Sequence, residues 1–512
     1  MRLVLASALV ALAGLAAGTP LAAQARDLKK AAASITAKDV SRRIHLIADD
    51  SMMGRDTPSP GLEATAAYIA AQFKSFGLRP GGDSGTYLQR FPLVLRRLQV
   101  ERSYVEFTDL GGQGSILLPY ATSVVQHAGE QDGKPVTAPI LILGGPPDPT
   151  QFPADSVVAG KLLVWVVKWS EVPKFANAIV LKAMAAGAAG VIAVSDRDTT
   201  VIAAAAGQAG RVQVSRDDGA ARTGGIPLVV EVPRAAIVAR YPEAQGVFNQ
   251  LDAASAMTAL SMADWEATVM AADTVLGTAS APNVVGILEG TDPTLKQEYV
   301  VFSAHMDHIG ISAGRPDSIN NGADDDGSGT VGILELAEAF TRKKAATKRS
   351  LIFLTVSGEE KGLWGSAYFT AHPPVPIDQV VANLNMDMIG RNWPDTVETI
   401  GMTFSSLGPT LDSVAAAHRD LGMTPVNDLA PEERRLFRSD HYNFARAGVP
   451  ILYFTSGHHP DYHEPSDSPD KINAEKESRL LQLVFWTGQA VGNAAARPTW
   501  NPGALEQVRQ AR

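Results

Sequence analysis

The sequence predicts an α/β protein in which a mostly parallel central sheet is flanked by helices and interrupted by a smaller inserted α/β unit. The first observation is the regular alternation of strand-like apolar runs and helical segments after Asn283, which is typical of a parallel sheet. The second is the middle of the chain, residues 118–272, where short β-branched runs are joined by Gly/Pro turns. The third is composition, because 45% hydrophobic and 19% charged residues in a chain of 512 allow more than one buried core.

The N-terminus has the layout of a secretory signal. Arg2 precedes an apolar run from Leu3 to Ala17, which is too short for a comfortable membrane span, and the small-x-small triplet Ala23-Gln24-Ala25 follows. We therefore expect residues 1–25 to be a signal peptide and the protein to be exported, to the periplasm or out of the cell. No later run of eighteen apolar residues lacks a charge or a breaker, so no stable membrane insertion is expected after cleavage.

Charge and cysteine content exclude several functions. The 45 Lys and Arg residues stand against 54 Asp and Glu, a formal charge of −9, and no basic cluster is interleaved with aromatic residues. Nucleic acid is therefore not an expected partner. The absence of cysteine removes disulfides, thiolate zinc sites and cysteine nucleophiles. Any metal ion must be held by histidines and carboxylates.

The first part of the main domain, residues 26–117, contains a predicted helix. Apolar positions recur at helical spacing from Ala64 to Phe73. Pro58-Ser59-Pro60-Gly61 supplies the turn before this helix, and the Gly/Pro-rich stretch from Gly77 to Gly82 ends it.

Residues 118–272 read as a separate α/β unit. Strands are expected at Pro139–Leu143 and Lys161–Val167, followed by an Ala-rich helix from Phe175 and a strand at Gly190–Val194. This order of elements, with Ala186-Gly187-Ala188-Ala189-Gly190-Val191-Ile192 at its end, resembles a protease-associated (PA) domain.

Residues 273–512 carry the strands of the central sheet and the chemistry. Ligands of parallel sheets bind beyond the carboxyl ends of the strands, and polar residues follow the expected strands Tyr299–Phe302, Leu351–Val356 and Val380–Leu384. Asp and Glu are almost never buried without a partner, so their recurrence at strand ends points to a site. The candidate donors are two imidazoles, three carboxylates and one further glutamate: His305, His463, Asp324, Glu360, Asp387 and Glu359.

This donor set fits two zinc ions better than one. A single zinc with an open position uses only three protein ligands, whereas two zincs that share one carboxylate use both imidazoles and all three carboxylates. The remaining Glu359 is then the expected general base for an attacking water, because neighbouring side chains of an extended backbone point to opposite sides. Two zinc ions that activate a water and polarise a carbonyl perform hydrolysis.

Three other histidines compete for these roles. His308 lies three residues beyond His305 and is expected to be hydrogen-bonded at the pocket rim rather than to bind metal. His458 and His459 are adjacent to one another and close to His463 in the chain, so either of them remains an alternative ligand.

The motifs that contain these residues resemble the co-catalytic di-zinc exopeptidases of the leucyl aminopeptidase and aminopeptidase Y type, which often carry an inserted PA domain. The resemblance includes the Gly54-Arg55 and Gly61 region. It implies that Asp324 bridges the zincs, that His305 and Asp387 hold one, and that Glu360 and His463 hold the other. It further implies that Asp307 orients the imidazole of His305, and that substrate contacts come from Tyr462, Ser439, Asp440 and His441.

The expected function is therefore release of N-terminal amino acids from peptides by an exported zinc aminopeptidase. Asp325, Asp326 and Asp440 are candidates to receive the substrate ammonium group. A carboxypeptidase or dipeptidase on the same scaffold is the alternative, since a C-terminal carboxylate needs cations. Four arginines are available for that role: Arg391, Arg434, Arg435 and Arg438. A glutaminyl cyclase-like enzyme and a non-enzymatic PA-bearing binding protein fit less well, because the complete ligand set favours two metals and an intact site.

Overall fold

The structure is a computed structural model in which two compact units are formed by residues 1–92 with 280–512 and by residues 93–279. The predicted signal peptide falls almost entirely on residues 1–24, which lie outside the described residues and leave that prediction untested. The described part of the chain comprises residues 25–112, 114–128, 133–217, 228–312, 314–342 and 345–510. No helix in these ranges is both long and apolar enough to cross a membrane.

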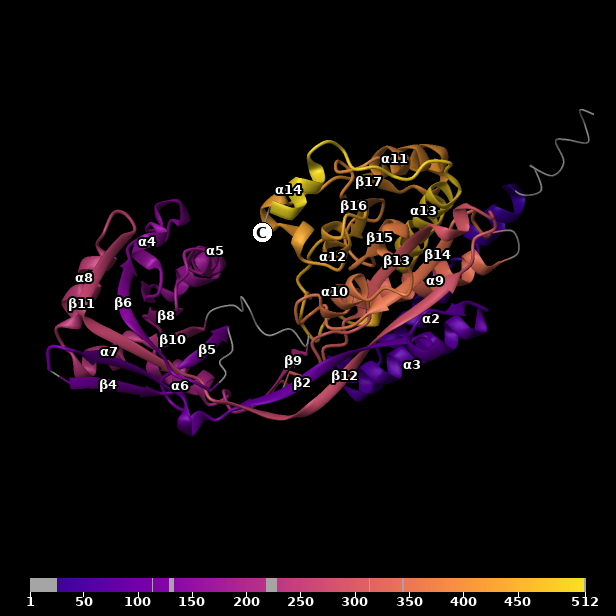
Figure 1. The fold of residues 1–512 in the computed structure, drawn as a ribbon. Helices are drawn as coiled ribbons and strands as arrows, with labels where there is room; N and C mark the ends of the chain where they lie inside the picture. Colours follow the sequence, from indigo (N-terminus) through magenta and orange to yellow (C-terminus); the bar gives the residue numbers. More distant parts are fainter. Residues whose placement is uncertain are drawn as a thin grey trace, which may run out of the picture. The chain divides into compact units, whose positions relative to one another are not determined.

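The first unit is built on a sheet whose described strands run in the order β17-β16-β18-β15-β13-β14-β12-β2-β9, with β1 paired to β12 (Figure 1). The β9 edge of this sheet extends beyond that unit, because β9 and the residues 93–97 of β2 that pair with it belong to the second unit. The central pairs β14-β13, β13-β15 and β15-β18 are parallel, as the alternation of strands and helices predicted. The strands are β1 (Arg79–Pro80), β2 (Leu88–Leu98), β9 (Val212–Arg216), β12 (Asp273–Leu288), β13 (Tyr299–His305), β14 (Ser350–Val356), β15 (Val380–Met386), β16 (Thr396–Ile400), β17 (Thr424–Val426) and β18 (Ile451–Thr455).

Helices cover both faces of this sheet because successive strand residues alternate between the two faces. Phe302 and Phe353 stack on one face and contact Phe340 of one helix, which in turn contacts Phe485 of another. Val301 faces the other side and packs in a core with residues of three further helices. The helices of the unit are α2 (Ala37–Ile47), α3 (Pro60–Ser75), α9 (Gly329–Thr341), α10 (Trp364–Ala371), α11 (Leu407–Ala417), α12 (His441–Arg446), α13 (Ala474–Asn493) and α14 (Ala504–Gln510).

The second unit, Leu93–Ala279, has its own eight-stranded sheet in the order β4-β3-β11-β6-β7-β8-β10-β5. Two apolar clusters lie on the two faces of this sheet, since Val164 belongs to one and Trp165 to the other. Its elements are β3 (Tyr104–Asp109), β4 (Gly114–Pro119), β5 (Val125–Ala128), β6 (Val136–Gly144), α4 (Asp155–Val158), β7 (Leu162–Val167), α5 (Val172–Ala185), β8 (Gly190–Ser195), α6 (Thr199–Ala206), β10 (Val229–Pro233), α7 (Arg234–Arg240), α8 (Ala244–Asp252) and β11 (Thr258–Met270).

This unit is wider than the insertion expected at residues 118–272. Most of the difference lies at its N-terminal side, where β3 pairs with both β4 and β11 and so belongs to the same sheet. The interpretation of the unit as a PA-like domain stays a prediction.

Candidate metal centre

The parallel strands bring the predicted donors to one edge of the sheet. His305 is the last residue of β13, and the register pairs it with Val356 at the end of β14. Glu359 and Glu360 follow β14 after a short turn, and Asp387 directly follows β15. The strand pairing therefore brings these side chains together, as the sequence predicted.

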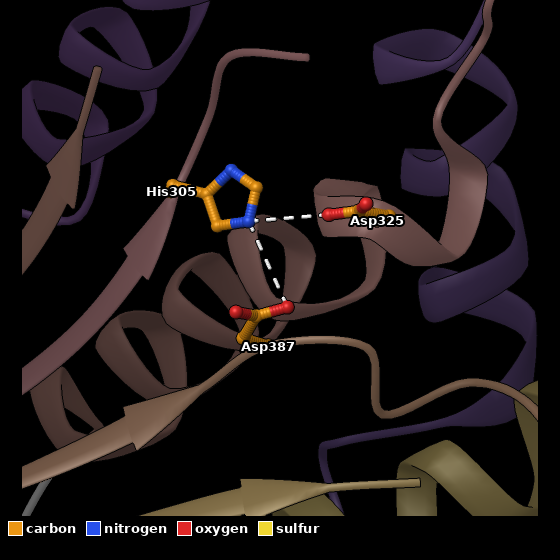
Figure 2. A group of neighbouring side chains, drawn as sticks. All are labelled: His305, Asp325 and Asp387. Carbon is orange, nitrogen blue, oxygen red and sulfur yellow. Dashed lines mark ion pairs between the residues drawn. The ribbon is translucent and has the colours of Figure 1, made fainter. Parts of the chain in front are cut away.

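A first group of buried side chains is formed by His305, Asp325 and Asp387 (Figure 2). Nε2 of His305 lies 3.2 Å from Oδ1 of Asp325 and 3.7 Å from Oδ1 of Asp387. The other ring nitrogen, Nδ1, lies 3.1 Å from the backbone oxygen of Asp307. This backbone contact orients the ring, so that Nε2 faces the two carboxylates.

A second group lies on the other side of Asp325. Nε2 of His463 is 3.2 Å from Oδ2 of Asp325 and 3.1 Å from Oε2 of Glu360. Nδ1 of His308 is 2.7 Å from Oε1 of Glu360 and 3.8 Å from Oδ2 of Asp325. The two oxygens of Asp325 thus face the two groups separately, which is the geometry of a bridging ligand.

The structure does not bring Asp324 to either group, so the residue that faces both groups is Asp325 and not, as expected, Asp324. Oδ1 of Asp324 accepts a hydrogen bond of 2.6 Å from the backbone N–H of Gly390. Oδ2 lies 3.2 Å from Nε2 of His459. Asp324 therefore holds the loop after β15 and the buried ring of His459.

The reason is the backbone of the segment η7 (Ala323–Ser328), which leaves the helical region at Asp325 and Asp326. Asp326 holds the start of the following helix, since its Oδ1 accepts from the N–H of Gly329, the first residue of α9, at 2.9 Å. Oδ2 of Asp467 accepts from the N–H groups of Asp324 and Asp325 at 3.0 and 3.1 Å. Asp326 stands three residues before Gly329, where its side chain can accept from the first N–H of the helix. This spacing is the sequence signal that could have assigned different roles to the three adjacent aspartates.

The electrostatics of the two groups are those of a site with excess negative charge. Burial alone would lower the pKa of His463, but the nearby carboxylates of Asp325 and Glu360 outweigh it and raise the pKa to about 10. Burial likewise opposes a raised pKa at His305, where the carboxylates of Glu359 and Asp387 prevail and hold it well above its ordinary value. Both imidazoles are therefore held in a strongly anionic environment that favours a bound cation.

His463 lies in the second group together with His308, whereas its rivals His458 and His459 do not. His459 faces Asp324, as described above, and Nδ1 of His458 pairs with Oε2 of Glu433 at 2.9 Å. The ring of Tyr462 stacks on that of His463 with centroids 3.9 Å apart. Tyr462 lines the cavity beside the metal groups, as expected of a substrate contact.

The other three expected substrate contacts do not line that cavity. Ser439, Asp440 and His441 are fully buried, and Oγ of Ser439 accepts from the side-chain amide of Asn385 at 2.9 Å. The ring of His441 stacks on Tyr453 at 4.4 Å, and burial lowers its pKa to about 3. These residues therefore lie buried at the start of α12 and not in the cavity wall.

Asp307 acts on the loop that carries Glu359 more than on the imidazole of His305. Its Oδ2 accepts from the backbone N–H of Gly358 at 2.7 Å and from Oγ1 of Thr57 at 2.9 Å. Its Oδ1 accepts from the N–H of Glu359 at 3.3 Å and lies 3.7 Å from Nδ1 of His305. The carboxylate thus ties the ends of β13 and β14 together at the site.

Arg55 is a structural residue of the site whose role the sequence did not reveal. Its guanidinium is fully buried and donates to four backbone oxygens. Two of them, on Asn321 and Gly322, directly precede η7 at 2.6 and 2.8 Å, and the others belong to Ile47 and Met306. The Gly54-Arg55 segment therefore fixes the loop from which Asp325 projects.

The two groups border one small cavity on the sheet edge. Glu359 lies in its wall but in neither group, and the charges that act on it include those of His305, Glu360 and Asp387. The wall is completed by Met388 after β15 and by residues of β18 and the loops around it: Arg435, Arg438, Tyr453, Thr455, Gly457, His458 and Tyr462.

The donor set fits metal ions. Nε2 of His463 is buried and has no hydrogen bond to a described residue, although two carboxylate oxygens lie 3.1 and 3.2 Å away. A ring nitrogen held so close to carboxylate oxygens without a hydrogen bond is placed as a metal ligand would be. Imidazole with carboxylate is the ligand chemistry of zinc in hydrolytic sites.

Comparisons with known proteins agree with this site. Residues 283–486 match the model of Peptidase family M28, and this segment contains both groups. Aminopeptidase YwaD of Bacillus subtilis (strain 168) is 27% identical over 214 residues, which are 40% of this chain and 43% of that protein. A probable leucine aminopeptidase of Arthroderma benhamiae is 28% identical over 211 residues, 40% of this chain and 56% of that protein. The chain spans about half the length of the curated relatives it matches.

Solved structures share the fold over almost the whole chain. An aminopeptidase from Aneurinibacillus sp. strain AM-1 aligns with a TM-score of 0.53 at 19% identity, covering 92% of this chain and 97% of that one. A zinc aminopeptidase from Bacillus subtilis aligns with a TM-score of 0.50 at 18% identity, covering 90% and 97%. The predicted fold class is confirmed by these matches, and the predicted resemblance to the aminopeptidase family by the family model and the curated relatives.

Substitution of adjacent aspartates tests which one joins the two groups. Asp325→Asn leaves one carbonyl oxygen where two carboxylate oxygens face His305 and His463. We expect zinc affinity to fall by at least 10- to 100-fold, which is the typical loss when a residue that only hydrogen-bonds to a metal ligand is replaced. The matched variant Asp324→Asn keeps an oxygen for the N–H of Gly390 and should still bind two zinc ions per chain. Zinc titration followed by elemental analysis measures both; loss of zinc only in Asp324→Asn contradicts the assignment.

Proposed function

Residues 283–486 place this chain in peptidase family M28, and on that premise we propose that the protein is a zinc-dependent exopeptidase that releases N-terminal amino acids. The single observation that carries the proposal is Asp325, whose two carboxylate oxygens face separate His/carboxylate groups at 3.2 Å. A shared carboxylate between two such groups is what two neighbouring hydrolytic zinc ions require.

Each ion would be held by one imidazole, one further carboxylate and the shared Asp325. His305 and Asp387 would hold the first, and His463 and Glu360 the second. When bound, such ions would polarise a substrate carbonyl and lower the pKa of a water. His308 supports the second group, because its Nδ1 hydrogen-bonds to Glu360 and fixes the orientation of that carboxylate.

Glu359 is the residue that would take the proton of the attacking water. It lies in the cavity wall and is left over by both groups, and the hydrogen bonds of Gly358 and Glu359 to Asp307 hold its loop in place. The hydroxyl of Tyr462 has no hydrogen bond to a described residue and lies in the same wall. It is therefore available to donate to the oxygen that becomes negative when the carbonyl is attacked.

Of the three aspartates expected to receive the substrate ammonium group, only Asp325 lines the cavity. Asp326 is fully buried and engaged by the backbone N–H groups of His305, Gly329 and Met388, and Asp440 lies behind the cavity. The carboxylates that remain in the wall are those of Asp325, Glu359, Glu360 and Asp387. An ammonium group would therefore be received by the same carboxylates that surround the reacting bond, which favours cleavage at the first peptide bond.

Metal removal tests the proposal as a whole. Because every proposed ligand is a nitrogen or oxygen donor, a chelator should abolish hydrolysis of an unblocked peptide such as Leu-Gly-amide, and about two equivalents of zinc should restore it. The N-acetylated form of the same peptide should not be cleaved. Full activity of the metal-stripped protein would contradict the metal mechanism, and cleavage of the acetylated peptide would contradict release from the N-terminus.

The adjacent glutamates provide a second test. Glu359→Gln should retain both zinc ions and bind peptide, but lose about 100- to 10,000-fold in kcat because an amide cannot accept the proton. Glu360→Ala should lose zinc from one site and recover part of its activity at high zinc concentration. Kinetics and zinc content measured side by side distinguish the two roles, and a Glu359→Gln variant that loses zinc would reverse them.

We also propose export, which rests on the apolar run from Leu3 to Ala17 and the triplet Ala23-Gln24-Ala25 that follows it. N-terminal sequencing of the full chain expressed in a bacterial host should find a mature protein that begins near Arg26 in the periplasmic or extracellular fraction. An uncleaved protein that remains in the cytoplasm would contradict the proposal.

A further inference from the structure

The cavity beside the metal groups has one arginine in its wall that is not engaged in an ion pair with a described residue. Arg438 is exposed and lies in the wall, and its guanidinium forms no ion pair and no hydrogen bond with the described residues. A guanidinium offers five donors in a planar fork that matches a carboxylate. A guanidinium without an ion-pair partner in the wall of a substrate cavity is available to bind a carboxylate of the substrate.

The neighbouring cation in the wall is already neutralised, which leaves this role to Arg438. Arg435 pairs with Glu398 through Nη1, and its Nη2 lies 2.9 Å from Oε2 of Glu433. The same oxygen of Glu433 lies 2.9 Å from Nδ1 of His458. Glu433 therefore forms its ion pairs with these two partners and none with Arg438, whose charge acts on it only from a greater distance.

The other two arginines that the sequence offered for a carboxylate do not line the cavity. Nη2 of Arg391 pairs with Oδ2 of Asp461 at 2.9 Å. The guanidinium of Arg434 lies over the ring of Phe437, 4.9 Å from its centroid. Arg438 is thus the arginine that the structure leaves for a substrate.

We propose that Arg438 is a specificity-determining residue that binds a carboxylate on the residue released behind the scissile bond, so that the preferred substrates are dipeptides. This inference rests on the proposed function and names its substrate class. Metal groups and Arg438 border the same small cavity, and one residue of extended chain spans only about 3.3–3.6 Å. The terminal carboxylate of a dipeptide lies one residue beyond the bond that is cleaved, whereas in longer peptides an uncharged amide stands there.

A side-chain carboxylate of the released residue offers the same chemistry, so the experiment includes both sources. The zinc-loaded protein is assayed with Leu-Gly, Leu-Gly-amide and Leu-Asp-amide. We expect Arg438→Gln to raise KM for Leu-Gly by about 10- to 100-fold, as loss of hydrogen bonds to a charged group does, with kcat and the hydrolysis of Leu-Gly-amide unchanged. A loss confined to Leu-Asp-amide would assign the side-chain carboxylate as the ligand instead.

Two further variants and a binding measurement sharpen the test. Arg438→Lys keeps the charge but not the fork and should give an intermediate KM, while Arg434→Gln, an exposed arginine outside the cavity wall, should change nothing. Calorimetry of Leu-Gly binding to the inactive Glu359→Gln protein, with and without Arg438→Gln, should show the same 10- to 100-fold difference without turnover.

The outcomes separate this inference from the proposed function. Equal effects of Arg438→Gln on free and amidated dipeptides, or no effect on either, would overturn the role of Arg438 while hydrolysis of Leu-Gly-amide by the unaltered protein still upholds the peptidase. Failure of that protein to hydrolyse any of the three peptides would overturn the proposed function itself.

Discussion

The repulsion among buried carboxylates is the constraint on which the rest of this site depends. Asp325, Glu359, Glu360 and Asp387 share the wall of one small cavity, and carboxylates in a low-dielectric surrounding repel one another strongly unless cations intervene. Burial and the charge of Glu360 raise the pKa of Glu359 well above its ordinary value, which expresses the same excess of negative charge. The imidazoles of His305 and His463, and the metal ion proposed in each group, offset that repulsion.

Holding such groups together requires a rigid frame, and the frame is built from hydrogen bonds rather than from ion pairs. Arg55 donates to four backbone oxygens around η7, Asp467 accepts from the N–H groups of Asp324 and Asp325, and Asp307 accepts from the turn after β14. Each bond is modest by itself, but buried polar groups are costly to leave unpaired. The network therefore fixes the loops that carry the donors in one arrangement, and the carboxylates cannot relax away from one another.

Most of the fold and of the site follows from local patterns in the sequence. The strand runs that end at His305, Val356 and Met386 are apolar and β-branched, and parallel pairing places their carboxyl ends at one edge whatever the details of packing. His305, Glu360 and Asp387 could be assigned for this reason, and the position of Glu359 outside both groups follows from its neighbour facing the other way. The residue bounds of the second unit could not be predicted in the same way, because the pairing of β3 with β11 joins residues far apart in the chain.

The sequence by itself determined the chemistry of this protein, since the types and order of the donors after the strands admit little besides a metal-dependent hydrolase. Only the tertiary structure decided which of three adjacent aspartates joins the two groups, because the backbone at Asp325 and Asp326 departs from the helix and turns their side chains in different directions. It also decided which arginine is left for a substrate. The sequence does not distinguish Arg435 from Arg438 as a ligand for a carboxylate. Arg435 is neutralised by Glu398 and Glu433, and these contacts depend on how the loops around β18 pack.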